Sequence, residues 1–186
     1  MTSNFPKRKY PRADFLDYNI GDYFVTVCTK NKLHYFGYIK DGEMHLSMVG
    51  HFLRDNIEST STHFPEARVL NYVVMPNHVH LIVSIGDNEN IPRQNKCVNR
   101  GKLNEAAALA VAAGRDPTMS THHNSRLAVI VGSMKSATSR FAKRNDIEFG
   151  WQPRFHDHLI RGPHDGDNIW NYINNNVANW EKDCFH

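Results

Sequence analysis

Two consecutive apolar runs, ARVLNYVVM and HVHLIVSI, lie near the middle of the chain and are separated only by Pro76 and Asn77. Runs of this length that are rich in β-branched and aromatic residues predict β-strands, and a Pro-Asn pair predicts a tight turn. The second strand is therefore expected to pair back on the first. The rest of the chain has to fold around this antiparallel hairpin.

The flanking segments alternate between strand and helix patterns. Strands are expected at 22–30 and 154–161, a small hairpin at 33–47 with its turn at Asp41-Gly42, and helices at 47–63 and 125–145. Asp165 or Asp167 is expected to cap a last helix. The resulting order is the βαββαβ arrangement of an α+β protein with a ferredoxin-like antiparallel sheet, helices on one face, and an added C-terminal helix.

Composition favours one folded domain that spans residues 1–186. Hydrophobic residues make up 40% of the chain and charged residues 22%, as in ordinary globular proteins. Residues 86–124 are polar and contain the stretch NEAAALAVAAG, so a variable loop excursion is expected there.

The three cysteines are far apart, and no apolar run suits a signal peptide or a membrane span. A cytoplasmic location without a membrane partner is expected.

Two histidines interrupt the second apolar run. Residues two apart share a strand face, so His78 and His80 are expected to point the same way, together with Val74. Such a pair can present two nitrogen ligands to one divalent metal ion, although histidines on a half-exposed strand give the same pattern. His156 and His158 repeat the spacing, and packing or hydrogen bonding in the sheet is the simpler interpretation of that second pair.

The last helical segment places a tyrosine and an amide one turn apart. Tyr172 and Asn176 fall on the same helix face as Ile169 and Ile173. On these residues alone, Tyr172 is more simply interpreted as a core aromatic whose hydroxyl reaches the surface. Asn176 alone is more simply a residue that ends the helix.

Taken together, these motifs resemble those of a known family. VVMPNHVHLIV is similar to the signature of the single-tyrosine HUH transposases, and WQPRFHDHLIR with IWNYINNNVANW resembles their C-terminal block. The resemblance is strongest to the branch associated with repetitive extragenic palindromes. It implies that His78, His80 and Asn176 bind a divalent metal ion, Mg²⁺ or Mn²⁺, and that Tyr172 is the catalytic nucleophile. Val177 stands where the family often has proline, so the helix is expected to run on.

The resemblance also implies an activity. It is that of a metal-dependent endonuclease and strand transferase for single-stranded DNA, which forms a 5′-phosphotyrosine at hairpin-flanked sites. Single-stranded or hairpin DNA is the implied partner, and a homodimer would supply two tyrosines for complete excision. The alternatives are a domesticated hairpin-binding protein with little or no excision activity, and a metallohydrolase that activates water and does not use the tyrosine.

Local clusters of positive charge are candidates for DNA contacts, although the net charge is only +3. One cluster is in the N-terminal arm and the other on the predicted helix at 125–145, and basic residues of this kind meet phosphates while an aromatic ring can stack on a base. Solvated surface is the simpler alternative for each. The candidates are Lys7, Arg8, Lys9, Tyr10, Lys135, Lys143 and Arg144.

Overall fold

The computed structural model describes residues 20–86 and 125–182. Its main sheet has four strands in the order β4-β5-β1-β6, and every neighbouring pair is antiparallel. The strands are β1 (Gly21–Cys28), β4 (Ala67–Val74), β5 (His78–Ile85) and β6 (His156–Leu159). This strand order confirms the ferredoxin-like βαββαβ arrangement, and the hairpin formed by β4 and β5 is present as predicted.

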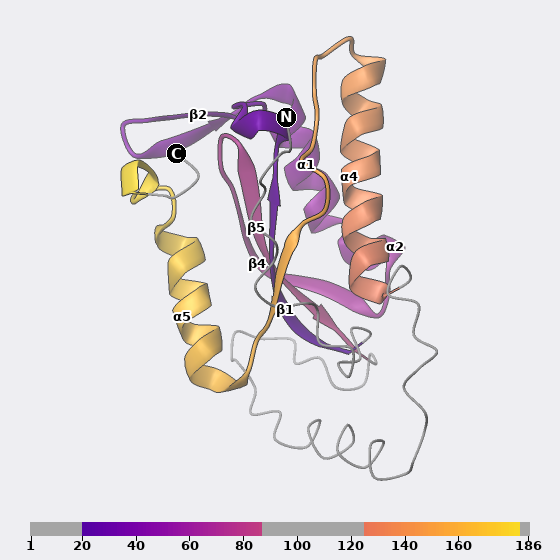
Figure 1. The fold of residues 1–186 in the computed structure, drawn as a ribbon, viewed down its shortest axis with the longest axis vertical. Coiled ribbons are helices and arrows are strands. Elements are labelled where there is room, and N and C mark those ends of the chain that lie inside the picture. Colours follow the sequence, from indigo (N-terminus) through magenta and orange to yellow (C-terminus); the bar gives the residue numbers. More distant parts are fainter. Residues whose placement is uncertain (1–19, 87–124, 183–186) are drawn as a thin grey trace, which may run out of the picture.

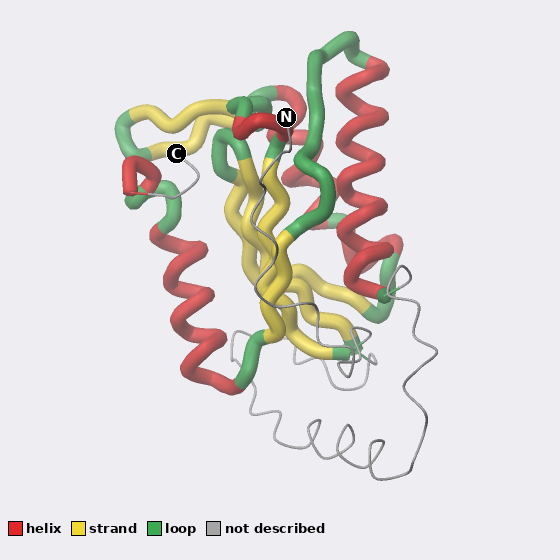
Figure 2. The backbone as a smooth tube through the Cα atoms, in the orientation of Figure 1, coloured by secondary structure: helices red, strands yellow, loops and turns green. Residues whose placement is uncertain are grey.

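Helices cover both faces of the sheet. Figure 1 shows α1 (Met48–Glu58) and α4 (Arg126–Arg144) on one side of the strands and α5 (Gly162–Asn175) on the other. The same division is visible in the tube of Figure 2, where the strands run between the helical layers. The shorter helical segments are α2 (Thr60–His63), η1 (Lys30–Lys32) and η4 (Trp180–Lys182). None of the helices that the structure describes is long and apolar enough to cross a membrane.

The hydrophobic core lies between the sheet and the pair α1 and α4. Side chains that alternate along β1 and β5 point into it, for example Val25 and Val83, and Leu53 of α1 meets them from the helical layer. Val74 also joins this core. The sequence predicted that Val74 would point the same way as the two histidines, and this prediction is wrong. The turn after β4 pairs Val74 with Val79, whose side chain faces away from the histidines.

The opposite face of the same strands is polar where α5 covers it. The register pairs Thr26 with His80 and Cys28 with His78, so these four side chains point toward α5. All four are buried. One face of the sheet therefore builds the core, and the other carries the groups that could do chemistry.

A second, two-stranded sheet forms the predicted small hairpin from β2 (Gly37–Lys40) and β3 (Glu43–Leu46). Asp41 and Gly42 have φ angles of 54° and 77°, as a tight two-residue turn requires. Gly50 allows α1 to pack against the start of this hairpin, since a Cβ there would lie 2.2 Å from the carbonyl oxygen of Phe36.

Several predicted boundaries are wrong. The helix expected to reach His63 breaks at Ser59, which ends α1 and precedes α2. The last helix begins at Gly162 with Pro163 in its first turn, so neither Asp165 nor Asp167 is its cap. The regular part of this helix ends at Asn175, but Asn176 keeps helical φ and ψ angles and the chain follows a helical path through the next turn, as expected for a segment with Val177 in place of proline. Apart from Gly86, the excursion expected at 86–124 lies outside the described residues, so that domain boundary stays a prediction.

Candidate active site

The two histidines of β5 meet at their ring nitrogens. Nε2 of His78 and Nε2 of His80 are 3.0 Å apart, and both side chains are at most 1% exposed. Two nitrogens bound to one metal ion at right angles, each roughly 2.1 Å from it, are themselves about 3 Å apart. The spacing of the imidazoles therefore suits adjacent ligands of one ion.

The second nitrogen of each imidazole is held by a neighbouring side chain. Nδ1 of His78 lies 2.8 Å from Oδ1 of Asn77, and Nδ1 of His80 lies 2.8 Å from the hydroxyl oxygen of Thr26. The Asn77 oxygen can only accept, so Nδ1 of His78 carries the proton and its Nε2 keeps the lone pair. Bonds of this kind orient metal-binding histidines.

The environment keeps His78 neutral. Burial, with a smaller effect from the charge of Lys32, lowers the pKa of His78 to about 3. A neutral imidazole at physiological pH can donate its lone pair to a metal ion without first losing a proton.

Tyr172 reaches this histidine pair from α5. Its hydroxyl oxygen lies 3.2 Å from Nε2 of His80, and its side chain remains 43% exposed. Phe24 packs in the same place, with its ring stacked on His80 at 5.2 Å and edge-on to Tyr172 at 6.1 Å. The hydroxyl therefore reaches the buried imidazoles while part of the side chain faces solvent.

Asn176 follows the last residue of α5 and is only 3% exposed. Its Oδ1 is one of the buried side-chain atoms that, within the described part of the chain, have no hydrogen-bond partner. A buried amide oxygen without a partner is energetically costly unless a cation or another donor satisfies it. Helical spacing places Asn176 one turn after Tyr172 and on the same side of the helix.

These residues fit a divalent metal ion. Two imidazole nitrogens and one amide oxygen form a mixed set of ligands that suits Mn²⁺ and, less well, Mg²⁺. The described residues contain no group of three or more His, Cys, Asp or Glu side chains that could hold a metal ion. That observation leaves the histidine pair in place, because the third ligand expected here is an amide.

Comparison with known proteins places the chain in a family. No protein-family model matches it. Over 164 residues it is 32% identical to an uncharacterized protein of Haemophilus influenzae, and the match covers 88% of this chain and 83% of that protein. The two proteins belong to one family. A solved structure of the REP-associated tyrosine transposase bound to a REP hairpin matches 94% of this chain and 74% of that chain at 18% identity, with a TM-score of 0.57. The chain has the fold of the HUH tyrosine transposases.

In this HUH transposase fold, several groups around the histidine pair were not expected from the sequence. They are Phe24, Thr26, Asn77 and Trp180, whose ring lies 6.2 Å from that of His78. Asn77 could have been predicted from the sequence as a partner of the histidine pair, because it directly precedes His78. Thr26 and Phe24 could be found only through the register between β1 and β5, which pairs Thr26 with His80.

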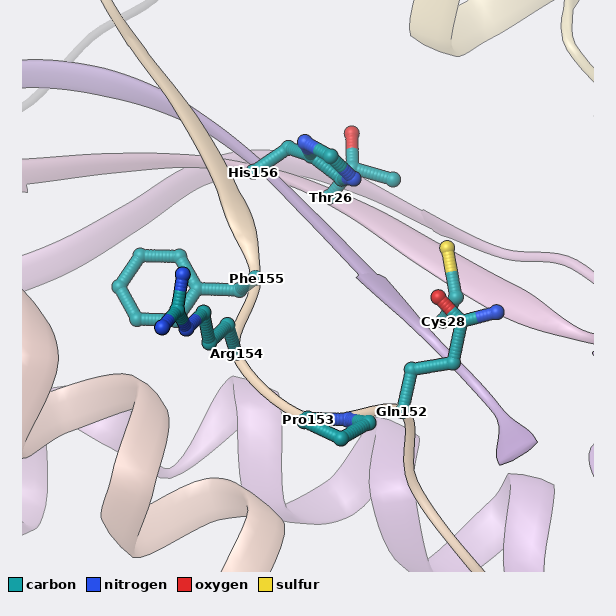
Figure 3. A pocket seen from close by; sticks show the side chains of 7 residues that line it. All are labelled: Thr26, Cys28, Gln152, Pro153, Arg154, Phe155 and His156. Carbon is teal, nitrogen blue, oxygen red and sulfur yellow. The ribbon is translucent and has the colours of Figure 1, made fainter. Parts of the chain in front are cut away.

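A cavity of ≈ 120 Å³ adjoins the site on the β1 side. Figure 3 shows it between Thr26 and Cys28 of β1 and the segment 152–156 that leads into β6. Lys135 of α4 fixes this segment, since its Nζ donates to the carbonyl oxygens of Gln152 and Arg154 at 2.8 and 2.9 Å. Burial lowers the pKa of Lys135, consistent with this internal role.

The other basic candidates are not brought to the tyrosine. Lys143 and Arg144 are exposed at the C-terminal end of α4, which packs on the sheet face opposite to α5 (Figure 1). Lys7, Arg8, Lys9 and Tyr10 lie outside the described residues. The candidate DNA contacts on α4 and the candidate nucleophile thus lie on different sides of the sheet.

The second histidine pair is tied to the start of the tyrosine helix. Nε2 of His158 lies 2.9 Å from Oδ2 of Asp165, and the same oxygen accepts the backbone N–H of Arg161 at 2.9 Å. Partial burial acts to raise the pKa of the Asp165 carboxyl, but the bonds from Arg161 and His158 outweigh it and hold this pKa below its ordinary value of 3.8. His158 is therefore hydrogen-bonded, as the simpler interpretation of the second histidine pair predicted.

This carboxylate leads to a prediction about stability and pH. The pKa of Asp165 is lower in the folded protein than its ordinary value of 3.8. The ionised carboxylate therefore contributes to the free energy of unfolding above pH 3.8, and this contribution is lost as the pH falls through the pKa of the folded protein. Asp165→Asn should therefore lower the free energy of unfolding near neutral pH, and the difference from the wild type should disappear in acid. Urea denaturation across a pH series measures this, with Asp167→Asn as the matched loss of a carboxylate from the same helix. A difference that does not change with pH would contradict it.

Proposed function

We propose that this protein is a metal-dependent endonuclease and strand transferase for single-stranded DNA, a transposase that acts through Tyr172. The observation that carries the proposal is the meeting of one phenol with two imidazoles. The Tyr172 hydroxyl lies 3.2 Å from Nε2 of His80, which lies 3.0 Å from Nε2 of His78. A nucleophile beside a pair of metal ligands is the minimal arrangement for metal-assisted phosphoryl transfer to a side chain.

Three side chains of the site would hold the metal ion. His78 and His80 would bind it through Nε2, and Asn176 through the buried Oδ1 that lacks a hydrogen-bond partner among the described residues. A bound Mg²⁺ or Mn²⁺ would withdraw charge from the scissile phosphate and stabilise the leaving 3′ oxygen. Asn77 and Thr26 orient the two imidazoles for this task through their bonds to Nδ1.

The proposed step exchanges one phosphodiester for another. The phenol oxygen of Tyr172 bonds to phosphorus, and the bond from phosphorus to the 3′ oxygen breaks. The phenol loses a proton and the 3′ oxygen gains one, which leaves a 5′-phosphotyrosine and a free 3′-hydroxyl. Attack by the 3′-hydroxyl of another strand reverses the step and joins new partners, so no ATP is needed.

The substrate class follows from the access that the tyrosine requires. In-line attack on a phosphodiester needs a flexible backbone, which single strands and hairpin flanks offer and a continuous duplex does not. The structural relative in this fold class was solved bound to a REP hairpin, and we extend hairpin-flanked DNA to this chain as part of the proposal. Lys143 and Arg144 would contact phosphates away from the site, and a cytoplasmic homodimer would supply two tyrosines.

A water-activating hydrolase is less consistent with this site. Such an enzyme commonly adds carboxylate ligands, and the described residues place no third His, Cys, Asp or Glu in a metal-binding group with the histidines. The Tyr172 hydroxyl occupies the position beside His80 instead.

The test uses hairpin DNA with randomised single-stranded flanks, labelled at either end, and the purified full-length protein with Mn²⁺. A 5′-phosphotyrosine retains the strand downstream of the cut. The 3′-labelled DNA should therefore migrate as a protein adduct on a denaturing gel, and the 5′-labelled DNA should give a free fragment. Free fragments from both labels would indicate attack by water. Hairpin binding without cleavage in Mn²⁺ or Mg²⁺ would favour the domesticated hairpin-binding protein.

A further inference from the structure

Asparagine side chains form a continuous stripe beside the tyrosine. Asn168, Asn171, Asn175 and Asn179 recur at spacings of three and four residues, so they follow one side of α5 and of the turn after it. The helical path continues through this turn, since the N–H of Asn179 donates to the carbonyl oxygen of Asn175 at 3.1 Å. We call these four residues the amide stripe, and all four are exposed.

The amide stripe lines a hollow that the side of Tyr172 also borders. This hollow of ≈ 390 Å³ is bordered by the four amides together with Tyr172, Asn176 and Lys182. A strand whose phosphate lies at the Tyr172 hydroxyl would place its neighbouring nucleotides along the stripe. The position of these amides is thus set by the helix that presents the nucleophile.

The chemistry of the stripe suits bases better than phosphates. Phosphates are bound best by Lys and Arg, whereas a carboxamide offers one acceptor and two donors, a combination that matches the edges of nucleobases. Asn175 and Asn179 each use Nδ2 to donate to the carbonyl oxygen four residues earlier, at 2.8 and 2.9 Å. These bonds hold the two amides in place and leave each with an oxygen and a second N–H for a ligand.

Helix formation does not account for the stripe. Asparagine has a lower helix propensity than alanine, lysine or glutamate, and exposed positions are where such better helix formers are easily accommodated. Asn174 differs from the stripe, because it lies on another side of the helix and bonds to Asn71 of β4 at 3.1 Å. That amide docks the helix, whereas the bonds of Asn175 and Asn179 are to the backbone of their own segment.

We infer that the amide stripe reads base edges in the single strand next to the attacked phosphate. Its ligand is unpaired nucleobases, whose hydrogen-bonding edges are free in a single strand, and Lys182 at the end of the stripe contacts the backbone. The inference rests on the proposed function, because it takes single-stranded DNA as the ligand. It adds that base selectivity beside the cut is set by the helix that carries Tyr172.

The test measures base preference without catalysis. Full-length protein in EDTA selects from hairpins with randomised single-stranded flanks, and the bound pool is sequenced. The wild type should enrich particular bases at one or two flank positions. In Asn175→Ala with Asn179→Ala this preference should fall roughly five- to a hundredfold, the range for loss of one bidentate base contact. Asn145→Ala at the end of α4 is the matched control, because its Nδ2 likewise donates to the carbonyl oxygen four residues earlier, and this variant should keep the wild-type preference.

The double variant should fold, since alanine favours the helix, and its melting temperature checks this. A wild type without base preference in the flank would overturn the inference, as would a folded double variant that keeps the full preference. Loss of binding to every flank equally would also overturn it, because it would indicate phosphate contacts. Failure of the proposed function would give a different result, namely no Tyr172 adduct in the presence of Mn²⁺. The binding selection is carried out in EDTA, so its result can be interpreted in either case.

Discussion

Tyr172→Phe is expected to abolish strand cleavage and the protein–DNA adduct together. The substitution keeps the ring, and with it the edge-on packing against Phe24, but removes the only atom that the proposed step uses for attack. Loss of a covalent nucleophile should lower the cleavage rate by a factor on the order of 10³ or more. Hairpin binding, Mn²⁺ binding and the melting temperature should stay close to those of the wild type.

The matched control for this variant is Tyr38→Phe. Tyr38 is 58% exposed on β2, in the small sheet that is separate from the one carrying the histidines, so its hydroxyl should be dispensable for cleavage. Single-turnover cleavage of the hairpin pool compares the two variants. Cleavage by the Tyr172 variant at a rate near that of the wild type would refute the nucleophile and would favour activation of water by the histidines.

The second large effect is expected at the histidine pair. His78→Ala or His80→Ala should each lower cleavage by roughly a hundredfold or more, because each removes a nitrogen from the proposed metal site. DNA affinity measured in EDTA should change little, since these buried imidazoles are at most 1% exposed. Mn²⁺ binding, followed by electron paramagnetic resonance, should weaken in both variants.

His51→Ala is the control for removal of a histidine, because His51 is exposed on α1 across the sheet. Wild-type rates of cleavage by a variant that lacks both His78 and His80, with metal present, would rule out the site. Unchanged Mn²⁺ binding in that variant would show that the ion binds elsewhere.

The fold was largely predictable because its signals are local. Apolar runs of strand length, the Pro76-Asn77 turn and the helical spacing in α4 each restrict a short segment, and together they give the strand order of the sheet. The errors lie where a local pattern competes with tertiary contacts or turn geometry. Ser59 ends α1 within a segment whose pattern continues, and Val74 turns to the core because the tight turn pairs it with Val79.

The candidate site was predictable only in part. His78 and His80 share a face because strand geometry requires it, and Tyr172 and Asn176 share a side of the helix for the same kind of reason. The approach of the helix to the strand, which brings the Tyr172 hydroxyl to His80, depends on packing between distant segments. The partners Thr26 and Phe24 depend on the register of β1 against β5, which no single segment encodes.

Lys135 has a structural role that its place in a basic segment of the sequence did not predict. Helical spacing places it among basic residues, yet its nitrogen is held by the carbonyl oxygens of Gln152 and Arg154. The sequence does not reveal this, since the segment it fixes lies after the end of α4. We therefore expect Lys143 and Arg144, which are exposed, to contribute more than Lys135 to any DNA affinity of this helix.

Peptide mapping of the trapped complex shows whether the phenol oxygen of Tyr172 is the atom that attacks DNA. Wild-type protein is incubated with hairpin DNA and Mn²⁺, the adduct is digested with protease and nuclease, and the modified peptide is sequenced by mass spectrometry. We expect a nucleotide linked through its 5′-phosphate to Tyr172, in the peptide that contains NYINNN. A linkage to any other residue, or cleaved DNA without a linked peptide, would contradict it.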